Sequence, residues 1–161
     1  MKRINIWSLV AMLCFGLTAC GENLGGDDNG GNGGNDSKVA IAGEWGIVSW
    51  NGAEPVFDIY VDFNEDGTFE MYQQVYSLTY ELFTGHYVAD KGIINGSYSD
   101  GSAWKCSYKY TVDKDEAGVQ RLTLDSEETI VVTSVYTATE IPAEVKAEAS
   151  ETRAMEVEPF L

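Results

Sequence analysis

The stretch that decides the fold is VDFNEDGTFEMY, residues Val61–Tyr72, in which two alternating runs flank a short acidic turn. Apolar and polar residues alternate up to Phe63, and they alternate again from Phe69 onward. A period of two residues places successive side chains on opposite faces, which is the pattern of a half-buried antiparallel strand. Asp66-Gly67 is a dipeptide typical of a tight hairpin turn. The stretch therefore predicts a β-hairpin.

The same residues also match the opening of an EF-hand calcium loop that starts at Asp62. A complete loop needs a bidentate glutamate at its twelfth position, and that position here is the neutral Gln73. The flanking runs alternate as strands, whereas an EF-hand has a helix on each side. We therefore interpret the segment as a turn and predict no metal site.

The alternating pattern continues through most of residues 41–142. Its clearest case runs from Trp104 to Val112, where aromatic and apolar residues occupy every second position. Gly- and Asp-rich turn signals separate about eight such runs, and no stretch suits the helix of a βαβ crossover. The pattern predicts an all-β domain of antiparallel strands. It suits a sandwich as well as a barrel, and we favour an up-and-down barrel because closure leaves no exposed sheet edge.

The first residues have the composition of an export signal. Lys2 and Arg3 precede an apolar run to Leu17, and small residues then lead to Cys20. A basic start, an apolar centre and small residues before a cleavage site are the features of a secretory signal. The cysteine directly after the small residues resembles the lipobox of bacterial lipoproteins. We expect residues 1–19 to be removed and Cys20 to carry lipid; the alternative is an ordinary signal peptide with a chance cysteine.

Two further segments differ in composition from the strand region. Residues 20–40 are rich in Gly, Asn and Asp, and we expect a flexible tether with a typical reach of roughly 20–25 Å. Residues 143–161 are predicted to form an acidic tail or a short helix. Because the apolar residues there are mostly alanine, we expect this segment to be frayed or disordered rather than docked.

The chain is strongly acidic, with a formal net charge of -16. Removal of residues 1–19 takes away two positive charges and no negative ones, which gives -18. Such a surface repels nucleic acid and anionic membrane lipids. We therefore expect no nucleic-acid partner, and we expect contact with the membrane only through the lipid on Cys20.

No pattern in the sequence indicates catalysis or a cofactor. His86 is the only histidine, and Cys106 is the only cysteine left once Cys14 is removed and Cys20 is lipidated. Neither has the partners of a metal site or a catalytic triad. Cys106 lies in an alternating aromatic run and is interpreted as a small buried hydrophobe. Paired carboxylates acting as in glycosidases remain an alternative without a motif. We predict that the protein is not an enzyme.

Aromatic residues are concentrated in the strand region and have two interpretations. One is a filled core, because aromatic side chains are common in strands and bury large areas. The other is a lined pocket, since a barrel of about eight strands is just wide enough for one small ligand. The residues predicted for such a pocket are Trp45, Phe57, Phe63, Phe69, Trp104, Tyr108 and Tyr110.

Several motifs in this region resemble a known family. In order, they are GEW (43–45), FNEDGTF (63–69), GHY (85–87), NGSYS (95–99), Trp104 and Tyr108. The first is similar to the Gly-x-Trp that opens lipocalin barrels. Behind a lipobox and a Gly-rich tether, the set resembles the lipocalin-like domain of small secreted lipoproteins of Gram-negative bacteria. The resemblance covers residues 41–142 and implies an eight-stranded barrel and ligand binding, with no catalytic residues. Gly21 after the cysteine is similar to lipoproteins sorted to the outer membrane.

These observations lead to three hypotheses, in order of preference. The first is a cell-envelope lipoprotein, anchored to the outer membrane through Cys20 and periplasmic or surface-facing, whose barrel binds a small apolar or amphipathic ligand. The second is a solid barrel that acts as an interaction module for a protein partner in an envelope complex. The third is a carboxylate-based hydrolase.

Overall fold

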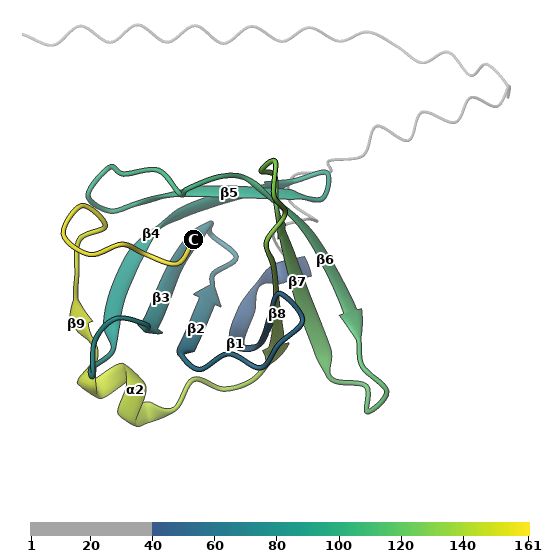
Figure 1. The fold of residues 1–161 in the computed structure, drawn as a ribbon, viewed down its shortest axis with the longest axis horizontal. Coiled ribbons are helices and arrows are strands. Elements are labelled where there is room, and N and C mark those ends of the chain that lie inside the picture. Colours follow the sequence, from purple (N-terminus) through teal and green to yellow (C-terminus); the bar gives the residue numbers. More distant parts are fainter. Residues whose placement is uncertain (1–39) are drawn as a thin grey trace, which may run out of the picture. The chain divides into compact units, whose positions relative to one another are not determined.

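The computed structural model describes residues 40–161, within which eight antiparallel strands close into a barrel (Figure 1). The strands are β1 (Gly43–Trp50), β2 (Asp58–Phe63), β3 (Thr68–Gln74), β4 (Glu81–Asp90), β5 (Ile93–Tyr98), β6 (Tyr108–Lys114), β7 (Gln120–Ser126) and β8 (Thr133–Ala138). Each pairs with the next along the chain, and β8 pairs with β1. The predicted all-β up-and-down barrel is therefore confirmed. Within the same residues no helix has the length and apolar composition needed to cross a bilayer.

The turn between β2 and β3 forms where the sequence predicts it. The Gly67 N–H donates to the Asn64 carbonyl oxygen at 3.0 Å. The Asp66 carboxylate accepts hydrogen bonds from the Thr68 N–H at 2.9 Å and from the Thr68 hydroxyl at 2.7 Å. Gly67 has a φ of 88°, a left-handed conformation that residues with a β-carbon rarely adopt. The acidic side chain at position 66 thus serves to hold a hairpin turn.

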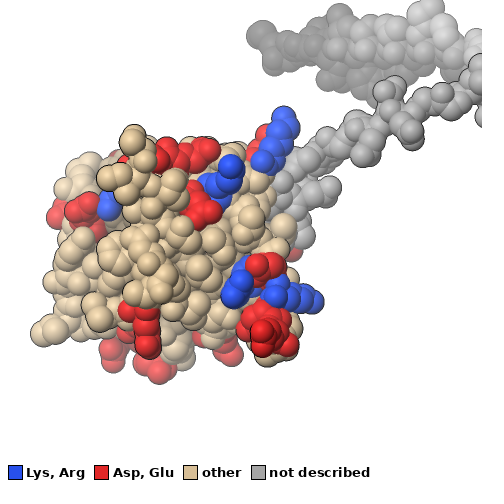
Figure 2. All heavy atoms as spheres, turned by 45° about the vertical axis from the view of Figure 1, so that its right-hand side comes forward, with Lys and Arg blue, Asp and Glu red and all other residues tan. Residues whose placement is uncertain are grey.

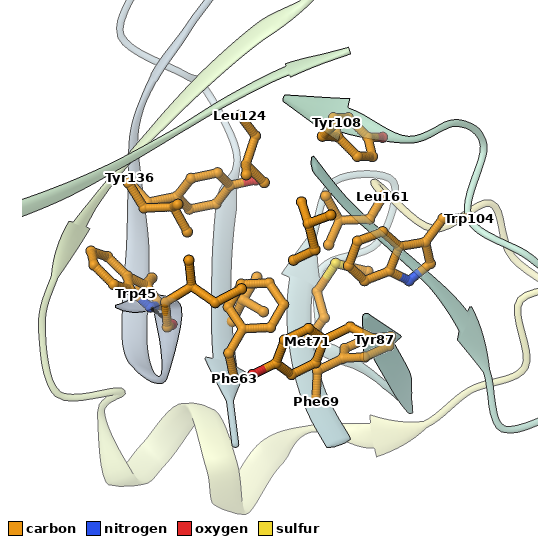
Figure 3. Packing of buried hydrophobic residues seen from close by; sticks show 14 of the residues in the cluster. Trp45, Phe63, Phe69, Met71, Tyr87, Trp104, Tyr108, Leu124, Tyr136 and Leu161 are labelled. Carbon is orange, nitrogen blue, oxygen red and sulfur yellow. Dashed lines mark hydrogen bonds between the residues drawn. The ribbon is translucent and has the colours of Figure 1, made fainter. Parts of the chain in front are cut away.

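The inner faces of the strands form one continuous aromatic and aliphatic core (Figure 3). Phe63 packs edge to face against Tyr87, with ring centroids 4.9 Å apart. At the end of the barrel where β1 begins, the Trp45 indole N–H donates to the Ile41 carbonyl oxygen at 2.8 Å. The largest side chains that are almost completely buried are Trp45, Tyr87, Tyr136, Phe63, Phe69 and Phe83.

Trp104 reaches the core from a loop, whereas the sequence predicts a strand over Trp104–Val112. β6 begins only at Tyr108, and it pairs with β5 over just two residue pairs. The Trp104 N–H bonds to the Gly96 carbonyl oxygen at 3.0 Å, and the indole lies over this glycine. A β-carbon at Gly96 would be 2.6 Å from the indole. The missing side chain of Gly96 therefore makes room for Trp104.

The segment after β8 docks on the barrel, and our expectation of a frayed or disordered tail is wrong. The helix α2 (Ala143–Glu148) lies on the outer face, where Val145 is buried against Tyr72 and Ile141. The short strand β9 (Ser150–Glu151) then pairs in parallel with the start of β4. The expectation failed because a few larger apolar residues, such as Val145, are enough to dock a segment whose apolar residues are mostly alanine.

The chain next turns back into the barrel. Leu161 is completely buried and belongs to the same core cluster as Trp104 and Tyr108. The C mark in Figure 1 and the Leu161 side chain in Figure 3 both lie within the ring of strands. Residues far apart in the sequence therefore complete one core.

Glu44 on β1 holds the start of the docked segment. Its carboxylate accepts a hydrogen bond from the Ile141 N–H at 2.6 Å and pairs with the Lys146 ammonium, also at 2.6 Å. Burial alone raises the pKa of Glu44, but these two contacts outweigh burial, and the pKa is lowered. A carboxyl pKa that is lower in the folded state means that ionised Glu44 stabilises the fold. This stabilisation is present above the ordinary pKa of 4.5 and is lost as the pH falls through the folded value.

We expect Glu44→Gln to lower the free energy of unfolding by about 1 kcal/mol at about pH 7, because it weakens two hydrogen bonds to a half-buried carboxylate. Urea denaturation at a series of pH values measures this difference, which should shrink toward about pH 3. Asp113→Asn is the matched control, since the Asp113–Arg121 pair at 3.2 Å is more exposed. A Glu44→Gln difference that is independent of pH would contradict the assignment.

Candidate functional site

Four connecting loops lie at one end of the barrel, because successive strands run in opposite directions. We call this end the mouth and define it by residues 51–57, 75–80, 99–107 and 127–132. A cavity of about 220 Å³ lies at the mouth, and residues 158–160 form part of its lining. The mouth is therefore the place where a ligand can reach the barrel interior.

Aromatic side chains form much of the cavity wall. Trp50 meets Phe57 edge to face, with ring centroids 5.5 Å apart, and Phe160 packs against both rings. Tyr108 and Cys106 line the cavity from the chain around the start of β6. Such a wall suits the apolar surface of a ligand.

Gln73 is a polar residue of the cavity lining and is completely buried. Its Oε1 accepts a hydrogen bond from the Phe160 N–H at 2.9 Å, and its Nε2 donates to the Glu158 carbonyl oxygen at 3.1 Å. The buried residues Ser126 and Ser134 also line the cavity, and the Ser126 hydroxyl accepts a hydrogen bond from the Val132 N–H at 2.8 Å. A mainly apolar pocket with a few placed polar groups is the usual form of a small-molecule site.

Two ionisable side chains at the cavity, Glu158 and Tyr108, have pKa values shifted by their surroundings. Glu158 pairs with Lys105 at 2.8 Å, and the hydrogen bond from this lysine lowers the pKa of Glu158. Burial, followed by interaction with the Cys106 thiol, raises the pKa of Tyr108. At neutral pH the carboxylate is therefore ionised and the phenol is protonated.

The residues predicted for a pocket fall into two groups. Phe57 and Tyr108 line the cavity. The others lie in or against the packed core, and they are Trp45, Phe63, Phe69, Trp104 and Tyr110. Figure 3 shows Trp45, Phe63, Phe69 and Trp104 surrounded by other core side chains. The cavity thus lies nearer the mouth than the predicted set implies.

Most residues that line the cavity were not in the predicted set, and Trp50, Gln73 and Phe160 are the most important of them. Alternation from Trp45 places Trp50 on the outer face, but the pairing of β1 with β8 shifts register between Ile47 and Ser49. Such a bulge changes which face the following residues present. The sequence does point to Gln73, because it is a polar residue at an inward position of β3. The sequence does not point to Phe160, because no local pattern indicates that its segment returns to the barrel.

The remaining candidates from the sequence can be placed briefly. His86 is exposed on β4, and Cys106 is half-buried at the cavity. Within residues 40–161 no group of three or more His, Cys, Asp or Glu side chains is arranged to hold a metal ion. The predicted lipid site at Cys20 lies outside the described residues.

Exposed apolar side chains surround the mouth. Val56, Leu78 and Ile130 are each at least 80% exposed, and they lie in three different loops. Single exposed apolar residues are ordinary, but several around one opening are typical of an interaction surface. Figure 2 shows a largely uncharged face with both acidic and basic side chains around its margin.

Comparison with known proteins adds no family assignment. No protein-family model matches the chain, and no curated protein has a significantly similar sequence. The functional argument therefore depends on the barrel and the geometry of its mouth.

Proposed function

We propose that this protein binds a small apolar or amphipathic ligand in the mouth of its barrel. The observation that carries the proposal is the cavity of about 220 Å³, with its aromatic wall and buried polar groups. Sites that enclose drug-sized ligands have volumes of roughly 300–1,000 Å³. The ligand is therefore smaller than these, or it leaves part of its surface outside the mouth.

Native mass spectrometry of the full chain, purified gently from its host's envelope, tests this proposal. We expect a reproducible added mass that is lost on denaturation. The identified compound should change the fluorescence of Trp50, which lines the cavity. Phe57→Ala should weaken its binding by about tenfold through loss of aromatic contact. Leu78→Ala is the matched control, because Leu78 is an exposed loop residue that does not line the cavity. A bare polypeptide mass, with no fluorescence response to apolar probes, would contradict the proposal.

Binding rather than catalysis fits the carboxylates at the cavity. A general acid at neutral pH needs a raised pKa, whereas the Lys105 ammonium lowers that of Glu158. Glu128, the other carboxylate of the lining, is exposed. Hydrolysis of a glycoside panel by the wild-type protein, lost in Glu128→Gln, would overturn this part of the proposal.

We also infer that the protein is exported and anchored to the outer membrane by lipid on Cys20. The sequence around Cys20 supports this inference, and the acidic surface leaves the lipid as the means of membrane contact. Cys20→Ala should abolish incorporation of labelled palmitate and location in the outer-membrane fraction. Cys106→Ala is the matched control and should keep both. Palmitate incorporation that survives in Cys20→Ala would show that the lipid is attached elsewhere.

A second candidate function is a protein-interaction module in an envelope complex. The observation in its favour is the group of exposed apolar residues around the mouth, including Leu78 and Ile130. Leu78→Lys should then remove a partner recovered by crosslinking in the envelope and leave the ligand mass unchanged. A partner retained by Leu78→Lys would argue against docking at the mouth.

A further inference from the structure

We propose that the mouth is a peptide-binding site, and that Glu158–Leu161 occupies it as an internal ligand that an external peptide displaces. The inference rests on the proposed ligand-binding function and names the ligand class. That class is an extended peptide with an acidic residue, a proline, an aromatic residue and an aliphatic residue in sequence. The contacts that hold the internal segment carry the argument.

Gln73 binds the backbone of this segment. Its amide donates to the Glu158 carbonyl oxygen at 3.1 Å and accepts from the Phe160 N–H at 2.9 Å. This is the pattern of a parallel β-ladder, in which one residue donates to the residue before its partner and accepts from the residue after it. Pro159 stands between the two bonds, is buried, and has no N–H that needs a partner. These two hydrogen bonds are to backbone atoms, which every peptide has, and the same site can therefore bind other peptides.

Two side chains of the segment have matched partners at the mouth. The Glu158 carboxylate pairs with the Lys105 ammonium at 2.8 Å. The Phe160 ring lies 5.7 Å from Phe57 and 6.5 Å from Trp50, centroid to centroid. These contacts specify an acidic residue at one position and an aromatic residue two positions later.

Leu161 provides the deepest contact. Its side chain is completely buried in the core, and its carbonyl oxygen accepts a hydrogen bond from the Tyr98 hydroxyl at 2.6 Å. When the segment leaves, this hydroxyl and the Gln73 Oε1 lose their partners in a buried place, and the Gln73 Nε2 keeps only its 3.1 Å hydrogen bond to the Glu81 carboxylate. Unpaired buried polar groups are costly, so a displacing ligand must replace these hydrogen bonds. A peptide replaces them, whereas a hydrocarbon does not.

The residues that precede the segment allow it to move. Residues 153–156 are exposed or half-exposed. They form a local turn onto the Arg153 carbonyl oxygen, the Ala154 and Met155 N–H groups bond to Asp100, and Ala154 packs against the edge of the core. None of these contacts belongs to the eight-stranded barrel ladder. The segment can therefore leave the mouth while every strand pair of the barrel remains intact.

The test uses the full chain in detergent and the fluorescein-labelled peptide Gly-Glu-Pro-Phe-Leu, with binding followed by anisotropy. The double variant Phe160→Ala/Leu161→Ala weakens the internal ligand and should bind this peptide at least about tenfold more tightly than the wild type. Adding Gln73→Met should reverse the gain, and a peptide of the same composition in scrambled order should bind more weakly, because it lacks the matched side-chain contacts. Met155→Ala is the matched control and should bind as the wild type does.

The proposal is overturned if a folded double variant does not bind the peptide. It is also overturned if Gln73→Met leaves peptide binding unchanged. If the double variant does not fold, hydrogen exchange of the wild-type protein tests the proposal instead. The Phe160 amide should then exchange at least about 100-fold faster than the Val61 amide in β2, and excess peptide should increase its rate. Equal rates for the two amides overturn the proposal. An added mass in native spectra together with no peptide binding would refute this inference and leave the proposed function standing.

Discussion

Gly85→Ala is expected to unfold most of the protein at room temperature. A β-carbon at position 85 would lie 2.1 Å from the Ser97 carbonyl oxygen and 2.9 Å from the Tyr98 Cα. Both are backbone atoms, so no side-chain rotation relieves the clash, and β4 must separate from β5. Overpacking a core commonly costs about 1–3 kcal/mol, and a clash with the backbone of a paired strand should exceed that range. Small domains are stable by only about 5–15 kcal/mol, so the loss is severe.

Urea denaturation and near-ultraviolet circular dichroism measure the effect of Gly85→Ala. Val88→Ala on the same strand is the matched control, because Val88 is 54% exposed. That control should shift the free energy of unfolding by less than about 0.5 kcal/mol. A Gly85→Ala protein with the wild-type unfolding midpoint would show that the two strands are farther apart than described here.

Trp104→Ala is expected to lower the free energy of unfolding by about 3–5 kcal/mol, the usual cost of deleting a buried aromatic side chain. The indole packs edge to face on Phe69 at 5.3 Å and on Tyr108 at 6.1 Å, and it fills the space over Gly96. Its removal leaves a cavity that these rigid neighbours cannot close. Urea denaturation of the variant measures the loss.

A second variant, Trp104→Phe, separates the loss of ring contacts from the effect of the indole N–H. The buried Trp104 Nε1 has no hydrogen-bond partner among residues 40–161. Replacing tryptophan by phenylalanine keeps an aromatic ring and removes this unpaired donor, which offsets part of the lost contact. We expect a loss of about 1 kcal/mol. If Trp104→Phe were as destabilising as Trp104→Ala, the indole N–H would have to be paired with a bound molecule.

Local patterns in the sequence were sufficient for the antiparallel strands, but they suited a sandwich as well as a barrel. The alternation on both sides of Asp66-Gly67 and the absence of a crossover helix lead to antiparallel strands, and the barrel was favoured because closure leaves no exposed sheet edge. The same patterns failed where a contact joins distant parts of the chain. Trp104 continues the alternation of β6 but leaves the sheet, because its position is set by space over Gly96.

The candidate site was less predictable for the same reason. Gln73 signals a polar group inside the barrel, but its partners Glu158 and Phe160 lie more than 80 residues further along the chain. Trp50 enters the cavity only because a register shift interrupts β1. Neither a long-range contact nor a bulge leaves a periodic signal that a short window of sequence can reveal.

Burial of Leu161 has a consequence for the order of folding. Trp45, near the start of the barrel, pairs with Ala138 near its end, and the core that they share also includes Leu161. The entropy of closing so long a loop is lost before these contacts can form, which makes folding slow. A nascent chain cannot complete this core before residue 161 has been synthesised. β1 can pair with β8 only once residues 133–138 have been synthesised. Until then β1 has an unpaired edge, and this interval is when intermolecular strand pairing and aggregation are most favourable.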